Sequence, residues 1–127
     1  MASFCVRVYH EDDVPNIVTV VLFTDAELGT MNVGVCRIDL ELPESQSLKQ
    51  KRNIIRSVIV KTRSRFNVAV AEIDLNDNHN VAKLGVVCLS KDSSHLDQIF
   101  SNVIQFIQES REDAVVGHID IEIMSGF

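Results

Sequence analysis

Basic residues are concentrated in one short segment of an acidic chain. The formal net charge is −6, yet residues 49–65 hold seven of the twelve Lys and Arg residues and none of the eighteen acids. Ammonium and guanidinium groups gathered in this way can bind a row of phosphates whatever the total charge of the protein. The seven bases are Lys49, Lys51, Arg52, Arg56, Lys61, Arg63 and Arg65.

The spacing of apolar residues predicts that these bases lie on a helix. Ser45 or Ser47 can cap its start, because a hydroxyl there accepts a hydrogen bond from an unpaired backbone N–H, and the helix should end near Arg65. Residues three or four apart share a helix face, which predicts one buried stripe. The stripe comprises Leu48, Ile55, Val58, Ile59, Thr62 and Phe66.

The bases flank this stripe on both sides. At about 100° per residue, Lys49, Arg52, Arg56 and Arg63 fall within an arc of roughly 60°, and Lys51, Lys61 and Arg65 lie across the stripe. The alternative is a solvated helix whose bases pair with acids elsewhere or suit the helix dipole. That alternative accounts for bases in the last turn but not for bases at the positive helix start. The predicted phosphate-binding set is Lys49, Lys51, Arg52, Arg56, Arg63 and Arg65.

Strands and a second helix complete the predicted domain. The order β-α-β-β-α-β, starting at Met31, predicts an α+β ferredoxin-like fold, in which a four-stranded antiparallel sheet carries both helices on one face. The four predicted strands are 31–42, 67–74, 81–90 and 115–124, and the second helix starts at Asp92, Ser93 or Ser94 and runs to about Arg111. The last strand should bury Val115, Gly117, Ile119, Ile121 and Ile123.

The face of the sheet opposite the helices should be acidic. The first and last strands are neighbours in this fold, which places four carboxylates together with Arg37 as the one fixed base among them. An RNA-binding sheet needs exposed aromatic residues and a basic surround, so this face is better suited to self-association or to covering by residues 1–30. The carboxylates are Asp39, Glu41, Asp120 and Glu122.

Residues 1–30 fall outside the predicted pattern, which divides the chain into an N-terminal extension and a domain at 31–127. Phe4–Tyr9 and Ile17–Phe23 have the composition of strands and could form a hairpin at the sheet edge or over its open face. Equally, Met31 could be the natural start of the functional unit and the extension a non-native leader.

Two sequence runs resemble the YlxP-like family of small bacterial proteins. Ser47 to Arg52 resembles its S-L-K-E-K-R run, and Arg65 to Glu72 resembles its R-F-N-V-S-V-A-E run, with Gln50 a departure. The resemblance covers about residues 31–124 and implies the ferredoxin-like fold. Because family genes commonly lie near those for translation initiation factor two and ribosome-binding factor A, it also implies a cytoplasmic protein that binds RNA or a ribosomal subunit.

Other chemistry has little support in the sequence. The four His and three Cys residues lack metal-ligand spacing, and no P-loop, G-x-G-x-x-G or G-x-S-x-G motif is present. We therefore expect no enzyme activity, cofactor, metal or small-molecule substrate. Unpaired cysteines and short apolar runs favour the cytosol without a membrane span. Glu72 and Asp74, at i and i+2 of a strand, should share one face, either as a carboxylate pair or ion-paired to nearby bases.

Overall fold

A computed structural model describes residues 5–10, 18–23, 31–74 and 77–127, with side chains described from residue 31 onward. Two short strands, β1 (Cys5–His10) and β2 (Val18–Phe23), pair antiparallel as a separate two-stranded sheet. The rest of the predicted extension lies outside the described residues. Whether the extension is native stays a prediction.

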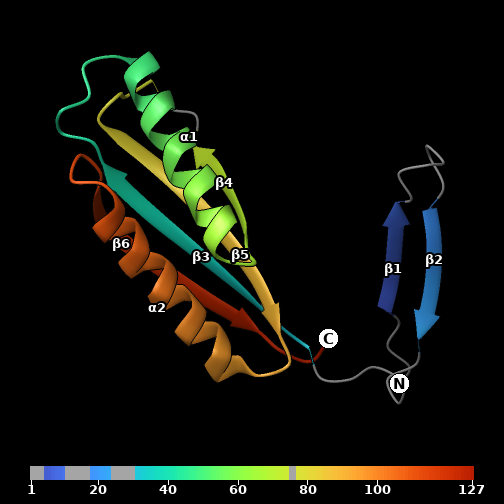
Figure 1. Cartoon of the computed structure of the whole chain (residues 1–127). Coiled ribbons are helices and arrows are strands. Elements are labelled where there is room, and N and C mark those ends of the chain that lie inside the picture. Colours follow the sequence, from blue (N-terminus) through green and yellow to red (C-terminus); the bar gives the residue numbers. More distant parts are fainter. Residues whose placement is uncertain (1–4, 11–17, 24–30, 75–76) are drawn as a thin grey trace.

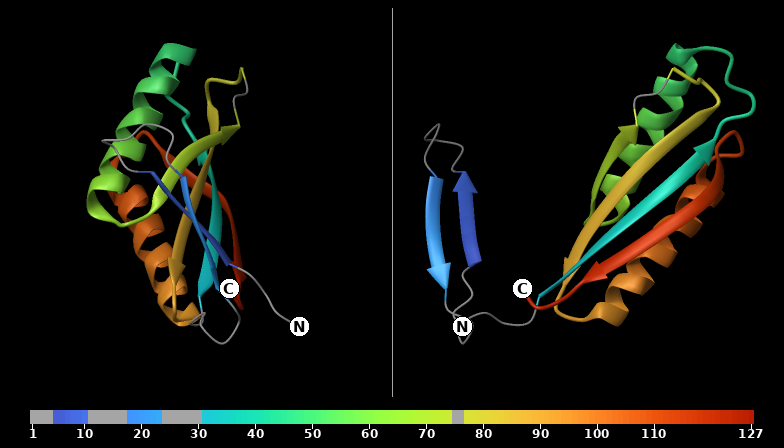
Figure 2. Two further views of the ribbon diagram at one scale, coloured as in Figure 1. Left: turned by 90° about the vertical axis from the view of Figure 1, so that its right-hand side faces the viewer. Right: turned by 180° about the vertical axis from the view of Figure 1, so that it is seen from behind.

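Residues from Met31 onward form the predicted ferredoxin-like fold. The sheet has the order β4-β5-β3-β6 with every neighbouring pair antiparallel, and both helices lie on one face of it (Figures 1 and 2). No helix in the described part of the chain is long and apolar enough to cross a membrane. In chain order the elements are β3 (Asn32–Glu41), α1 (Leu48–Arg65), β4 (Ala69–Asp74), β5 (Val81–Ser90), α2 (Ser93–Ser110) and β6 (Val115–Met124).

Both helices begin at the kind of residue that their sequences predict. The Ser47 hydroxyl accepts the Gln50 N–H at 3.1 Å, and the Gln50 side chain accepts the Gln46 N–H at 2.6 Å, which is a reciprocal capping arrangement. In α2 the Asp92 carboxylate caps through the Ser94 N–H at 3.0 Å. These bonds satisfy N–H groups that the helix itself leaves unpaired, and so they set where each helix starts.

The core lies between the helices and the sheet. Phe100 of α2 is fully buried, and its ring rests on β3 where Gly34 leaves room. A methyl group at Gly34 would lie 2.5 Å from Cε2 of that ring, so the close approach of ring and strand requires a glycine there. Cys36 of β3 and Cys88 of β5 are buried free thiols.

The predicted buried face of β6 is wrong for Val115 and Gly117 at its start, and Ile121, which was also predicted to be buried, is 40% exposed. Leu40 pairs with Val116 and Ile38 with Ile119, so two residues of β6 stand opposite one of β3 between these pairs. This bulge reverses the side-chain alternation. Val116 therefore packs against the core, and Val115 is 46% exposed.

Candidate functional site

Helix α1 carries several of its bases near its start, where positive side chains do not stabilise a helix. Its first turn contains no acid, and Lys49, Lys51 and Arg52 lie within its first five residues, near the positive end of the helix dipole. Arg63 and Arg65, in its last turn, have the favourable polarity. The bases at the start of α1 therefore need another explanation, which comes from their neighbours in the fold.

Three arginines line one hollow between α1 and the edge strand β4. Arg52, Arg56 and Arg63 come from one edge of the helix, as their spacing predicts, and the hollow has a volume of about 370 Å³. Arg52 and Arg56 are exposed, and so is Lys49 one turn earlier. We call this feature the arginine hollow; its remaining lining residues are Ile55, Ile59, Val60, Ala71 and Glu72.

Arg63 is held in place by the strand beside it. Its Nη2 donates a hydrogen bond to the Val70 carbonyl oxygen at 2.5 Å. This bond ties the last turn of α1 to β4, and Arg63 also lines the hollow. Arg63 therefore has two roles: it holds α1 against β4, and it lines the candidate site.

Lys51 does not share this exposed position. It is buried, with 3% of its surface exposed, and its Nζ donates to the Asn78 carbonyl oxygen at 3.0 Å and lies 4.0 Å from Oε1 of Glu72. An ammonium group so enclosed cannot meet a phosphate on the surface, so the structure gives Lys51 a structural role. The helical wheel missed it because its partners lie more than twenty residues away along the chain.

The Lys51 ion pair also changes the charge of the arginine hollow. Among the described residues, Glu72 is the one acid that lines the hollow, and the Lys51 ammonium group, 4.0 Å away, offsets its charge. Of the two outcomes expected for Glu72, the ion pair is found. Asp74 does not share its face, because a register shift between the two residues sets Glu72 opposite Leu84 and Asp74 opposite Lys83.

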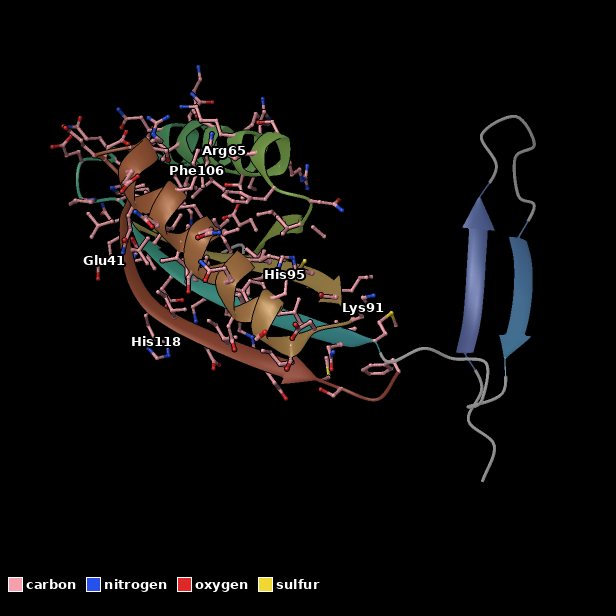
Figure 3. The ribbon with its side chains drawn as sticks, turned by 60° about the horizontal axis from the view of Figure 1, so that its bottom comes forward. Glu41, Arg65, Lys91, His95, Phe106 and His118 are labelled. Atoms are coloured by element: carbon pink, nitrogen blue, oxygen red, sulfur yellow. The ribbon has the colours of Figure 1, made fainter. Side chains whose placement is uncertain are left out.

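The other edge of α1 faces α2 rather than β4. The Arg65 guanidinium lies 5.5 Å from the centre of the Phe106 ring, and Phe66 meets the same ring edge-on with centroids 5.6 Å apart. Figure 3 shows Arg65 and Phe106 close together between the two helices. Arg65 thus clamps the end of α1 to α2 by a cation–π contact. Phe106 lies beside the apolar stripe of α2, and sequence periodicity did not single it out.

The open face of the sheet is acidic, as predicted, but it carries one base more than predicted. Arg37 stands opposite Asp120 on β6, with 3.8 Å between Nη1 and Oδ2. Lys83 of β5 stands opposite Asp39, so this face has a second base that the sequence analysis did not place there. Burial, together with the negative charge of Asp120, raises the pKa of the Cys36 thiol beneath this face to about 11. The thiol is therefore neutral and a poor nucleophile at neutral pH.

Comparison with known proteins places the chain in a family. Residues 33–121 match the family described as "Protein of unknown function (DUF503)". The uncharacterized protein YlxP of Bacillus subtilis is 22% identical over 80 residues, which cover 63% of this chain and 87% of that protein.

Two solved structures resemble the chain at low identity. The de novo designed protein Foldit4 is 14% identical with a TM-score of 0.44, over 74% of this chain and 96% of its own. SnoaB, a cofactor-independent oxygenase from Streptomyces nogalater, is 7% identical with a TM-score of 0.39, over 74% of this chain and 90% of its own. The family match, which spans most of the chain, confirms the YlxP-like resemblance: the protein belongs to the DUF503 family of proteins of unknown function.

Proposed function

We propose that this protein is a non-enzymatic accessory protein of RNA or the ribosome, acting in the cytoplasm in translation or ribosome maturation, and that it docks on phosphates through the arginine hollow. The observation that supports the proposal is the convergence of Arg52, Arg56 and Arg63 on one hollow. Among the residues that the structure describes, its single lining acid is Glu72, which is ion-paired to Lys51. The hollow thus offers a concentration of positive charge on a protein whose net charge is −6.

The residue type and spacing suit a chain of phosphates. Guanidinium groups bind phosphate oxygens through two parallel N–H bonds and remain charged at every physiological pH. With about 1.5 Å of rise per residue, Arg56 lies about 6 Å along the helix from Arg52, and Arg63 about 10 Å farther. A row of this length fits successive phosphates of a nucleic-acid strand better than one small anion.

The two sides of the domain would then have separate tasks. Both helices lie on one face of the sheet (Figure 2). The strand register places the acids Asp39, Glu41, Asp120 and Glu122 on the other face. A phosphate backbone is attracted to the first side and repelled from the second. In the proposed complex, RNA runs along α1 and β4, and the sheet face points away from it.

A second candidate function is a protein-binding or self-assembling module. The observation that favours it is the acidic strip on the chain's own open face, which could meet the arginine hollow of another copy. Such an assembly would dissociate as salt is raised, because exposed charges are screened. It would not require affinity for nucleic acid, so a direct binding measurement separates the two functions.

The decisive variant is Arg52→Gln/Arg56→Gln, measured by fluorescence anisotropy against mixed-sequence single-stranded RNA and against purified ribosomal subunits at several salt concentrations. If both side chains contact phosphates, the slope of log affinity against log salt should fall by roughly 1.4–1.8, since each contact contributes about 0.7–0.9.

The matched control is Arg37→Gln/Lys83→Gln, which removes the same charge from the acidic sheet face. The proposal expects that control to leave the slope unchanged. A slope that stays the same in the Arg52/Arg56 variant, or that falls equally in both variants, would contradict it.

A further inference from the structure

A second hollow lies on the other edge of α1, between that helix and α2. Its volume of about 300 Å³ is near the lower end of the range for pockets that bind small ligands, roughly 300–1,000 Å³. Its lining combines a guanidinium group with aromatic rings and amides, whereas the described lining of the arginine hollow contains no aromatic residue. We call it the interhelix pocket; it is lined by Arg65, Phe66, Asn102, Gln105, Phe106 and Glu109.

The two helices together give this pocket a surface for stacking. The Arg65 guanidinium lies 5.5 Å from the centre of the Phe106 ring, and Phe66 meets that ring edge-on (Figure 3). Both rings are only half-buried, and both line the pocket. Proteins that bind unpaired bases stack them on aromatic rings and on arginine guanidinium planes. The interhelix pocket therefore has the groups that hold the flat face of a base.

The amides of the pocket suit the edge of the same base. Asn102, Gln105 and Glu109 follow one another at spacings of three and four residues, so they share one face of α2. Gln105 Nε2 donates to Glu109 Oε1 at 3.0 Å. Asn102 Oδ1 accepts from Gln98 Nε2 at 3.1 Å. Among the described residues nothing bonds the Gln105 amide oxygen or the Asn102 amide nitrogen, so one acceptor and one donor remain for a ligand.

Positive charge adjoins the pocket. A wider hollow of about 700 Å³ shares the two rings and Arg65 with it and adds Lys61 and Ser64. The exposed Lys61 ammonium group can meet the phosphate of a nucleotide whose base is in the pocket. Arg63 and Arg65 differ by only about 3 Å along the axis of α1 and lie on its two edges. A strand docked in the arginine hollow therefore needs only to pass the end of α1 to reach the pocket.

We infer that the interhelix pocket binds one unpaired base of the RNA strand whose phosphates lie along the arginine hollow. The base stacks against Arg65 and Phe106. Its edge bonds the amides of Asn102 and Gln105, and its phosphate meets Lys61. This inference rests on the proposed RNA binding and narrows it to RNA with unpaired bases, since a base inside a duplex leaves the stack only at a cost.

The test compares two labelled strands of equal length by fluorescence anisotropy: mixed-sequence single-stranded RNA, and an abasic ribose-phosphate strand with the same phosphates and no bases. The natural protein should bind the RNA roughly 5- to 150-fold more tightly, which is the contribution of one stacked base. The salt slopes of the two strands should agree, because both meet the same cations. Phe106→Leu, which removes the ring and keeps an apolar side chain, should bring the affinity for RNA close to that for the abasic strand.

A second variant keeps the test independent of packing. Gln105→Ala changes an exposed side chain and should weaken binding of RNA while leaving binding of the abasic strand unchanged. Its matched control is Gln108→Ala, which removes the same amide from an exposed position of α2 outside the pocket and should change neither affinity. Circular dichroism reports whether Phe106→Leu keeps the helices.

The outcomes separate this inference from the proposed function. Equal binding of the two strands by the natural protein would overturn the base pocket and leave phosphate docking intact, whereas binding of neither strand would overturn both. A preference for RNA over the abasic strand that survives Phe106→Leu and Gln105→Ala would also overturn the pocket. Competition by adenosine monophosphate at the affinity of the RNA itself would make a free nucleotide the ligand, and so would contradict the inference.

Discussion

Helices α1 and α2 have the same length and pack on the same face of one sheet, yet they bury different chemistry. The buried residues of α2 are all apolar: Leu96, Phe100, Val103 and Ile107. Those of α1 include Lys51 and Thr62. In α1 these polar groups are satisfied, because Lys51 donates to Asn78 and the Thr62 hydroxyl donates to the Val58 carbonyl oxygen at 2.8 Å.

The difference teaches which helix serves mainly as scaffold. An all-apolar stripe is the simplest way to stabilise a helix on a sheet, and α2 has it. Helix α1 instead carries bases at its positive end, and its buried Lys51 is ion-paired to Glu72, which lines the arginine hollow. Lys51 has a structural role, whereas under the proposed function the exposed bases at the start of α1 serve what the helix presents to solvent.

The largest expected effect tests the scaffold helix. Phe100→Ala should lower the free energy of unfolding by about 3–5 kcal/mol, because it empties a fully enclosed site over Gly34 where the strand backbone cannot collapse. Urea denaturation measures this loss. Gln98→Ala, an exposed change on the same helix, should stay within about 0.5 kcal/mol. A small loss for Phe100→Ala would break the contrast between the helices.

A smaller effect is expected at the buried lysine of α1. Lys51→Ala should cost about 1–3 kcal/mol, because Glu72 and the Asn78 carbonyl group lose a partner in a partly enclosed place. Lys51→Met keeps the apolar length of the side chain and should lose less. If Lys51 touched phosphates, Lys51→Met would also lower the salt slope of RNA binding, and we expect no such change.

The two helix caps should respond differently to acid. Hydrogen bonds from Ser94, the side-chain bond first, hold the pKa of Asp92 below its usual range. The cap therefore stabilises the fold above the ordinary pKa of aspartate, and this contribution is lost as pH falls through the lowered value. Thermal unfolding of Asp92→Ala and of the natural protein should converge as pH falls. The Ser47 hydroxyl that caps α1 does not titrate. The loss of thermal stability caused by Ser47→Ala should therefore stay constant as pH falls.

The smallest expected effect on the stability of the protein comes from replacing the exposed arginines of the arginine hollow. Arg52→Gln/Arg56→Gln should change the free energy of unfolding by no more than about 0.5 kcal/mol, since both side chains are exposed and their removal relieves repulsion along one helix edge. Urea denaturation alongside the RNA measurement checks this. A large destabilisation would instead make these arginines part of the scaffold and remove the contrast with α2.

Much of the fold was predictable from local patterns. The limits of β5 and β6 agree with the predicted strands, and the spacing of apolar residues located both helices. The bulge in β6 was not predictable, because an inserted residue leaves the sequence pattern unchanged while moving Val116 to the core. The site was predictable for Arg52, Arg56 and Arg63, which share a helix edge. Lys51 and Phe106 depend on contacts between distant segments, and no helical wheel contains that information.

The ends of the 31–127 domain meet in the structure. The Met31 N–H donates to the Phe127 carbonyl oxygen at 3.0 Å, and the Phe127 N–H donates to the Met31 carbonyl oxygen at 3.2 Å. A short linker could therefore join these ends and new ends could be opened in a surface loop, giving a circular permutant with the same sheet. The same adjacency would let the domain be inserted into a loop of another protein without forcing that loop apart.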